Sequence, residues 1–252
     1  EVVVLDDLST GHRALVPPAA SLTVGDFGDT ALVAKLIREH EIEAILHFAA
    51  KIVVPDSIAD PITYYQNNSC NALALLDCAT RGGVRYFIFS STAAVYGEPE
   101  QNPVTEDSPH KPLSPYGRSK LMVEWMLEDV ARATGLSYVV LRYFNVAGAD
   151  PAGRTGQATP NTTHLIKTAV QTALGVRQSM EVYGTDYPTG DGSCLRDFIH
   201  VTDLAHAHLD ALRYLRRGGK SLTCNAGYQR GYSVLEVIEA VKRLSGVDFP
   251  VH

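Results

Sequence analysis

The sequence predicts an α/β protein built on a Rossmann-like, doubly wound parallel sheet. Short runs of β-branched or aromatic residues alternate with helical patterns through the first part of the chain. Strand–helix alternation of this kind implies parallel strands joined by right-handed crossovers. Such sheets bind ligands at the carboxyl ends of their strands, so the residues that follow strand ends are the first candidates for a site.

The elements of the sheet region follow from local patterns in the first 146 residues. Strands are expected at residues 2–5, 44–48, 86–89 and 138–143, and helices at 30–40, 61–81 and 115–134. Each helix has a capping residue or a first-turn proline where it should begin: Asp29 or Thr30, Pro61, and Ser114-Pro115. Gly82-Gly83 should end the second helix.

The pattern loosens after residue 147, where a smaller lobe is expected. Helices are expected at 162–174 and 202–215, a short strand at 181–183 and another at 222–225. The last helix should begin with the capping box Ser233/Glu236. We therefore divide the chain into a sheet domain over 1–146 and a second lobe over most of 147–252, with the strand at 222–225 returning to the main sheet.

Composition excludes two classes of partner. The chain has 22 Lys and Arg against 28 Asp and Glu, a net charge of −6, which argues against nucleic acid or an anionic membrane as partner. No apolar run approaches the roughly 18–20 residues that span a bilayer. The four cysteines form no C-x-x-C pair, which favours a reducing, cytoplasmic setting.

The strongest local candidate for chemistry is Tyr116 with Lys120, at the start of a predicted helix. Their i, i+4 spacing puts both on one face, where an ammonium would favour the phenolate and tune a general acid/base. The alternative is a surface tyrosine beside a lysine that pairs with Glu124. Thr92, at the predicted end of the third strand, adds a hydroxyl that can hold a substrate oxygen.

With these residues the chain resembles the extended short-chain dehydrogenase/reductases, and within them the UDP-glucose 4-epimerase (UDP-galactose 4-epimerase) branch. The resemblance covers nearly the whole chain. The segments that carry it are Leu5-Asp6-Asp7-Leu8, His47-Phe48-Ala49-Ala50, Tyr64-Tyr65-Gln66-Asn67-Asn68, Phe87 to Gly97, Ser114 to Lys120, Leu141-Arg142-Tyr143-Phe144-Asn145, Tyr183 to Thr189, and Arg196 to Val201.

The resemblance implies an NAD-dependent isomerase of galactose metabolism that inverts C4 of a UDP-hexose through a 4-keto intermediate. Residues 1–146 would be a partial NAD-binding domain and 147–252 a truncated UDP-sugar-binding lobe. Tyr116 would be the base, Thr92 would bond the same sugar oxygen, and Lys120 would tune Tyr116 and hold the nicotinamide ribose. The implied NAD contacts are Asp6, Asp26, Phe27, Phe48, Ala49, Ala50, Asn68, Tyr116, Lys120 and Tyr143. A carboxylate at Asp6 would favour NAD over NADP.

On the substrate side, the resemblance implies contacts from Asn145 and Arg196 to the diphosphate and from Leu165 and Tyr183 to the uracil. A guanidinium is well shaped for phosphate, so an acidic protein can still bind a dianion locally. Without the family pattern, Arg196 would as readily form an ion pair with Asp197 or a nearby acid. The resemblance also implies a homodimer paired through helices 61–81 and 115–134, with Trp125 or Met126 in the interface or in the core.

The sequence departs from the family at three places. The glycine-rich G-x-x-G-x-x-G loop would lie before Glu1 and a second diphosphate-binding arginine after His252, so we expect a fragment that binds NAD poorly and turns over slowly. A family lysine falls at Ile52, and Lys51 is one residue away. Acceptance of N-acetylated sugars is left open.

Three alternatives are weighed against the epimerase. A nucleotide-sugar dehydratase needs Asp-Glu just after the threonine, where this chain has Ala93 and Ala94. A related epimerase or reductase stays open, whereas a non-catalytic nucleotide sensor has no use for a tuned phenol. No metal is expected, because His200, His206 and His208 contain no i, i+4 pair and suit helix-surface or capping roles better.

Overall fold

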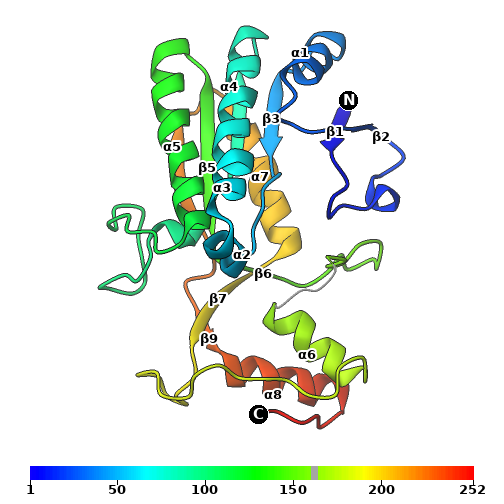
Figure 1. Cartoon of the computed structure of the whole chain (residues 1–252), viewed down its shortest axis with the longest axis vertical. Helices are drawn as coiled ribbons and strands as arrows, with labels where there is room; N and C mark the ends of the chain where they lie inside the picture. The colour runs from blue at the N-terminus through cyan, green and yellow to red at the C-terminus, as the bar shows by residue number, and fades with distance from the viewer. Residues whose placement is uncertain (160–163) are drawn as a thin grey trace. The chain divides into compact units, whose positions relative to one another are not determined.

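The computed structural model describes residues 1–159 and 164–252. The chain forms two compact units (Figure 1). The sheet unit comprises Glu1–Tyr143 and Asp203–Ala226, and the small unit comprises Phe144–Thr202 and Gly227–His252.

A four-stranded parallel sheet forms the centre of the sheet unit. Its order is β3-β4-β5-β8, with every neighbouring pair parallel. The strands are β3 Ala44–His47, β4 Tyr86–Ser90, β5 Ser137–Tyr143 and β8 Leu222–Ala226. The predicted α/β fold with a parallel sheet is confirmed, and β8 lies beside β5 although a long stretch of chain separates them in sequence.

A second parallel pair, β1 Val2–Asp6 and β2 Ala20–Val24, stands apart from these four strands. The strand expected at residues 2–5 is present as β1, whereas β2 was not expected from the sequence. The segment that forms β2 follows two prolines and mixes Ser and Thr with single apolar residues, so it lacks the continuous apolar run of a central strand.

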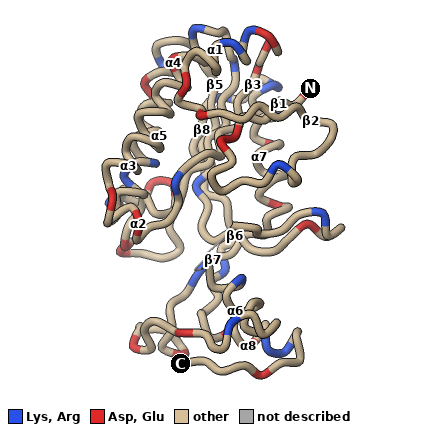
Figure 2. The backbone as a smooth tube through the Cα atoms, turned by 45° about the vertical axis from the view of Figure 1, so that its right-hand side comes forward, with Lys and Arg blue, Asp and Glu red and all other residues tan. Residues whose placement is uncertain are grey.

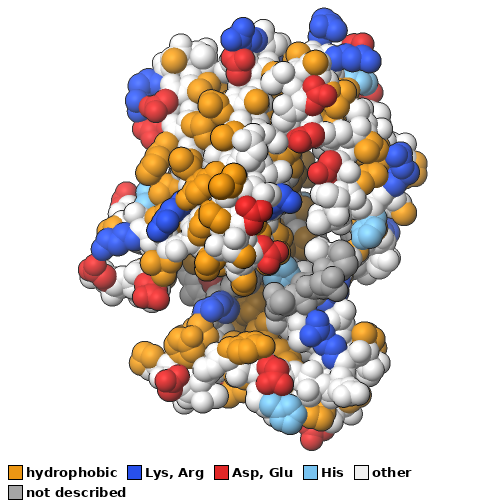
Figure 3. All heavy atoms as spheres, in the orientation of Figure 1, with side chains coloured by type: hydrophobic (Ala, Val, Ile, Leu, Met, Phe, Trp, Pro, Cys, Tyr) orange, Lys and Arg blue, Asp and Glu red, His pale blue; other side chains and the backbone are white. Residues whose placement is uncertain are grey.

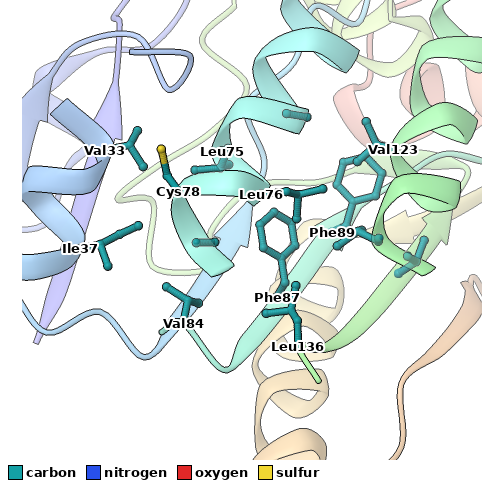
Figure 4. Close-up of a cluster of buried hydrophobic side chains, with 14 residues drawn as sticks. Val33, Ile37, Leu75, Leu76, Cys78, Val84, Phe87, Phe89, Val123 and Leu136 are labelled. Atoms are coloured by element: carbon teal, nitrogen blue, oxygen red, sulfur yellow. The ribbon is translucent and has the colours of Figure 1, made fainter. Parts of the chain in front are cut away.

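Helices cover both faces of the four-stranded sheet, as a doubly wound fold requires (Figure 1). Helices α1 Thr30–Glu39, α4 Asn71–Arg81 and α5 Pro115–Thr134 lie on one side and α7 Val201–Arg216 on the other. Phe87 and Phe89 of β4 pack with the first set (Figure 4). Ile88 between them packs with Ala211 and Leu215 of α7, because successive side chains of a strand point to opposite faces.

The predicted helix caps are confirmed. The carboxylate of Asp29 accepts the backbone N–H groups of Ala31 and Leu32, both at 3.0 Å. The Ser114 hydroxyl accepts the N–H of Gly117 at 3.1 Å. Asp29 and Ser114 thus satisfy donors that the first turns of α1 and α5 would otherwise leave unpaired.

The single helix predicted over 61–81 is wrong in one respect. The structure divides it into α3 Pro61–Tyr65, a π-helical turn Gln66–Cys70 and α4, and adds a short helix, α2 Val54–Ala59, before them. A π-helical turn holds one extra residue and is frequent at functional sites. Its occurrence here is set by the tertiary contacts of Asn68, which no local pattern reveals.

The small unit has a three-stranded sheet of order β6-β7-β9, formed by β6 Asn145–Ala147, β7 Leu195–His200 and β9 Gly231–Ser233. Helices α6 Leu165–Ala173 and α8 Val234–Ser245 pack through a shared apolar cluster that includes Ala169 and Ile238. The capping box at the start of α8 is present as predicted.

Two expectations for the small unit need correction or qualification. Residues 181–183 form no strand: the segment is held by a single bridge between Met180 and Val251 and a bond from the N–H of Val182 to His252 O. The helix expected from Thr162 begins at Leu165, and the first residues of the predicted range lie outside the described part of the chain.

Figure 2 shows Lys and Arg interspersed with Asp and Glu along the backbone. Within the described residues, no helix combines the length and the apolar character needed to cross a bilayer.

A buried ion pair joins α5 to β5. The guanidinium of Arg142 lies against the carboxylate of Glu124, with Nη2 to Oε2 at 2.5 Å and Nε to Oε2 at 3.1 Å, and each side chain is only 5% exposed. Arg142 also donates to the Tyr96 hydroxyl at 2.8 Å, and the Ser91 hydroxyl donates to Glu124. The pair therefore connects helix, sheet and the turn that follows β4.

Replacing Glu124 by Gln should lower the free energy of unfolding by about 3–5 kcal/mol, because it leaves the Arg142 charge buried without its counter-charge. Chemical denaturation measures the loss. Glu128→Gln on the same helix is the matched control, since Glu128 pairs with Arg132 at the exposed surface and should cost below about 1 kcal/mol. Equal losses in the two variants would contradict this account.

Candidate active site

Thr92 lies just beyond the carboxyl end of β4, in a short turn. Its backbone is extended, and its Oγ1 accepts the N–H of Ala94 at 3.1 Å, which starts the 3-10 turn Ala93–Val95. The side chain is mostly buried. Because a parallel sheet presents its ligand site at this edge, the Thr92 hydroxyl stands where the sequence analysis expected it.

Tyr116 is in the first turn of α5, and its phenol lies near the Thr92 side chain. The structure thus brings together a phenol and a hydroxyl from separate elements. Burial raises the pKa of Tyr116 well above its usual value, and the nearby Thr92 hydroxyl acts in the opposite direction. In this environment Tyr116 is a protonated phenol at neutral pH.

Lys120 lies one turn further along α5, but its ammonium does not bond Tyr116. Its Nζ donates to the backbone carbonyl of Ser90 at 2.9 Å and lies 4.8 Å from the centre of the Phe89 ring. Burial lowers the pKa of Lys120 to about 7, with the charge of Glu124 acting in the opposite direction. The hypothesis that Lys120 holds Tyr116 as a phenolate therefore gains no support from the contacts of its ammonium.

The alternative pairing of Lys120 with Glu124 does not describe the site either. The Glu124 carboxylate is occupied by Arg142 and by the Ser91 hydroxyl. Ser91 is the residue between the Ser90 carbonyl that holds Lys120 and the Thr92 hydroxyl that meets Tyr116. Through Ser91, the ion pair is therefore bonded to the turn that carries Thr92.

Asn68, a predicted cofactor contact, is fully buried at the π-helical turn. Its Oδ1 accepts the N–H of Lys51 at 2.8 Å, and its Nδ2 donates to Lys51 O at 2.9 Å and to Ser119 Oγ at 3.1 Å. Both ends of the amide are thus used to hold the segment after β3 against α5. Asn68 positions the residues that follow Ala49 and Ala50, and a direct cofactor contact stays a prediction.

Asp6 is the last residue of β1, and Asp26 lies two residues beyond the end of β2. One oxygen of Asp6 accepts the N–H of Leu8 at 2.7 Å, and a Cβ placed at Gly11 would come within 2.7 Å of the same atom. Asp26 accepts the N–H of Gly28 at 2.7 Å and is exposed.

Apolar residues follow the carboxyl end of β3. Phe48 is 56% exposed, and its ring lies 4.6 Å from that of His208, while Ala49 and Ala50 add only methyl groups. The ring of Phe27 packs 4.9 Å from that of His47. A dinucleotide needs a carboxylate for its ribose hydroxyls, apolar groups for its flat rings and small residues where the backbone comes close. The residues present supply all three, so they fit NAD.

The predicted substrate residues of the small unit are placed as follows. Asn145 begins β6, and its amide donates to Asp197 O at 3.1 Å. Arg196 is exposed on β7 and bonds Leu195 O and Cys194 Sγ; among the described residues it makes no ion pair.

The acid offered as an ion-pair partner of Arg196 is used elsewhere. The Asp197 carboxylate accepts the N–H groups of Tyr228 and Gln229, at 3.3 and 3.1 Å. Tyr183 is 86% exposed, and Leu165 begins α6, partly buried in its apolar cluster.

Comparison with known proteins places this geometry in a family. The model of the NAD dependent epimerase/dehydratase family matches residues 1–227. The chain belongs to this family. The match includes the turn with Thr92, the start of α5 and β5, so the hydroxyl, phenol and amine described above lie in the part of the chain shared with other epimerases and dehydratases.

Several individual proteins of this family are similar to the chain over nearly its whole length. UDP-glucose 4-epimerase of Azospirillum brasilense is 55% identical over 98% of this chain and 71% of its own length. UDP-glucose 4-epimerase of Streptococcus mutans is 45% identical over 99% of this chain and 75% of its length. UDP-glucose 4-epimerase of Brucella ovis in complex with NAD has a TM-score of 0.97 at 44% identity, covering 99% of this chain and 77% of that one.

Two buried polar residues have roles that the sequence did not predict. Glu124, expected only as a possible partner of a surface lysine, lies on the apolar face of α5 beside Val123 and Leu127, and a charged residue on that face was the available signal. His208 was expected in a helix-surface or capping role, which is wrong: it is buried in α7 and bonds Ser90. His200, by contrast, accepts the N–H of Thr202 at the start of α7, a capping role as predicted.

Burial of Lys120 should lower the free energy of unfolding by an amount that depends on pH. The pKa of Lys120 is lower in the folded chain than its ordinary 10.5, so between about pH 7 and 10.5 the unfolded chain binds more protons and stability rises with pH. A Lys120→Met variant lacks this dependence. Its stability advantage over the unmodified protein should therefore shrink by about 2 kcal/mol from pH 7 to pH 9 in urea denaturation.

Lys35→Met, at an exposed position of α1, is the control for this measurement. Its stability difference from the unmodified protein should not change over the same pH range. A constant difference for Lys120→Met as well would contradict a lowered pKa at Lys120.

Proposed function

We propose that the protein is an NAD-dependent UDP-glucose 4-epimerase, which interconverts UDP-glucose and UDP-galactose. The observation that carries the proposal is the juxtaposition of Thr92, just after β4, with Tyr116 at the start of α5, one helical turn from the buried Lys120. Relatives 42–55% identical over almost the whole chain are UDP-glucose 4-epimerases.

The proposed NAD site lies at the carboxyl edge of the sheet unit. Asp6 would bind the adenosine ribose, Asp26 and Phe27 would lie along the adenine, and Ala49 and Ala50 would let the backbone come close. Phe48, Asn68 and Tyr143 complete the proposed set, with Asn68 acting through the segment it holds. When bound, NAD supplies the hydride acceptor at the sugar carbon and, in its oxidised form, a positive charge.

Proton transfer is assigned to Tyr116. In its deprotonated form it takes the proton of the sugar 4-hydroxyl while the Thr92 hydroxyl bonds the same oxygen; loss of that proton and of the C4 hydride gives a 4-keto sugar. Return of the hydride to the opposite face, with the proton returned by Tyr116, gives the C4 epimer without net oxidation. Burial raises the pKa of Tyr116, but the same low dielectric strengthens the effect of positive charge brought beside the phenol.

The proposed substrate contacts lie in the small unit. Arg196 and Asn145 would bind the diphosphate, because a guanidinium and an amide both donate hydrogen bonds to phosphate oxygens. Leu165 and Tyr183 would contact the uracil. The exposure of Arg196 and Tyr183 leaves both side chains accessible to a ligand.

The competing functions differ at defined residues. Ala93 and Ala94 form the turn after Thr92 and carry no carboxyl group for the acid/base work of a dehydratase. Use of an N-acetylated sugar is a second candidate, because the UDP-Glc/GlcNAc 4-epimerase of Campylobacter jejuni is 46% identical to this chain with a TM-score of 0.86. An assay with UDP-N-acetylgalactosamine beside UDP-galactose decides between the two substrates.

A cytoplasmic location and a homodimer are part of the proposal. All four cysteines are free, which suits a reducing compartment. Large apolar side chains stand exposed on α3, α4 and α5: Ile62, Leu73, Met122 and Trp125. Figure 3 shows hydrophobic side chains gathered over α3 and α5. Met126 packs into the core instead, so of the two residues considered Trp125 belongs to the proposed interface.

Tyr116→Phe should lower kcat for UDP-galactose by at least about 100-fold, because it removes the acid/base and keeps the ring. A coupled assay for UDP-glucose formation measures the loss. Tyr214→Phe, at an exposed position of α7, should leave kcat unchanged. Undiminished turnover by the Tyr116→Phe protein would reject the mechanism.

Trp125→Glu should convert a dimer into monomers, because it puts a charge into the apolar face of α5. Sedimentation velocity reports the mass. Leu244→Glu, on α8 of the small unit and 83% exposed, changes charge and size in the same way and should leave the oligomeric state unaltered. A Trp125→Glu protein with the mass of the parent would place the interface elsewhere or exclude one.

A further inference from the structure

Ser90, the last residue of β4, bonds two side chains of the sheet unit. Its backbone carbonyl accepts the Lys120 ammonium at 2.9 Å. Its Oγ lies 2.6 Å from Nε2 of His208. Ser90 is fully buried, so each of these bonds is made without competition from bulk water.

The tautomer of His208 is fixed by its other ring nitrogen. Nδ1 lies 2.8 Å from the carbonyl oxygen of Leu204, one turn earlier in α7. A carbonyl oxygen can only accept, so Nδ1 carries the proton. The imidazole is neutral, because burial lowers the pKa of His208, and Nε2 is therefore an acceptor.

The direction of the hydrogen bond between Ser90 and His208 follows. Since Nε2 accepts, the Ser90 hydroxyl must donate to His208. The imidazole thus determines the orientation of a hydroxyl at the carboxyl edge of the sheet.

The packing around His208 holds the imidazole in this orientation. The ring lies 4.6 Å from that of Phe48 and 6.3 Å from that of Tyr143, and its side chain is buried. Phe48 follows β3, Ser90 ends β4 and Tyr143 ends β5, so His208 contacts residues at the carboxyl ends of three adjacent strands.

We propose that His208 is a positioning residue for the epimerase reaction: it accepts a hydrogen bond from the Ser90 hydroxyl, packs beside the Tyr143 ring, and so holds in place the residue whose carbonyl accepts Lys120. The inference rests on the proposed function for its kinetic consequence. Lys120 and Tyr143 are both proposed cofactor contacts, so an error in their placement should slow turnover without weakening the binding of the sugar nucleotide.

Two substitutions of His208 each keep one of its two hydrogen bonds and remove the other. In His208→Asn, the shorter amide can still donate to Leu204 O near the position of Nδ1, but it does not reach Ser90. In His208→Gln, the longer side chain carries an amide oxygen near the position of Nε2 and can accept from Ser90. Both are polar and uncharged, so a loss caused by burial of a polar group would appear in both.

The expected kinetic result is a split between the variants. His208→Asn should lower kcat for UDP-galactose about tenfold with KM within about twofold, and His208→Gln should restore kcat to within about threefold of the parent. Ser90→Ala should match His208→Asn, and the double variant should be no slower than either single one. His206→Asn, two residues earlier and exposed, is the control with unchanged kcat.

A histidine with only a structural role gives different kinetic results, and any one of three would overturn the proposal. The first is an unchanged kcat in His208→Asn, the second an equal loss of kcat in His208→Gln, and the third additive losses in the double variant. Thermal unfolding of each protein shows whether a low kcat reflects a smaller folded fraction, and rates are then expressed per folded molecule.

Histidine ¹⁵N NMR of the protein tests the same inference without turnover. The His208 resonances should show the Nδ1–H tautomer, and in Ser90→Ala the Nε2 shift should move because its donor is lost. An Nε2–H tautomer would overturn the proposal. If the parent protein fails to epimerise UDP-galactose, the proposed function is rejected, while the tautomer still decides whether His208 orients Ser90.

Discussion

The Glu124–Arg142 ion pair is the interaction on which the site depends. It connects α5, which carries Tyr116 and Lys120, to β5, and through Ser91 it also holds the turn after β4. Arg142 extends the network to Tyr96, whose hydroxyl donates to Asn225 of β8 at 2.7 Å. Because two buried charges must stay together, the helix and the strand ends cannot shift independently, and the distance between the Thr92 and Tyr116 hydroxyls is fixed by the fold.

Burial gives the site its chemical properties and also makes it costly. The environment that lowers the pKa of Lys120 and raises that of Tyr116 opposes the charged form of both groups. A core built only for stability would use apolar residues at these positions. Buried ionisable groups with shifted pKa values gather at functional sites, so the presence of both groups together with a buried histidine fits the proposed active site.

The sequence predicted what is local and missed what is made by distant contacts. The caps of α1, α5 and α8 and the strands β3, β4 and β5 depend on neighbouring residues, and their patterns were sufficient. The π-helical turn, the buried bonds of His208 and the pairing of Glu124 depend on partners far along the chain. Residues 181–183 have a strand-like composition, yet the backbone partner available to them is a segment near the end of the chain that offers one bridge and no ladder. Resemblance supplied the expected roles of Thr92 and Tyr116, and the structure added that the two side chains lie close together.

The π-helical turn over Gln66–Cys70 has a consequence for how this region can change during evolution. Each residue advances a helix by about 100°, so the extra residue of the turn sets which face of α4 meets the sheet. Deleting one residue there would restore a regular helix but rotate either Asn68 away from Lys51 and Ser119, or Leu75 and Leu76 away from the core. Point substitutions can accumulate along α4, whereas a change in its length at this turn would make the contacts of Asn68 and the core packing of α4 incompatible in a single step.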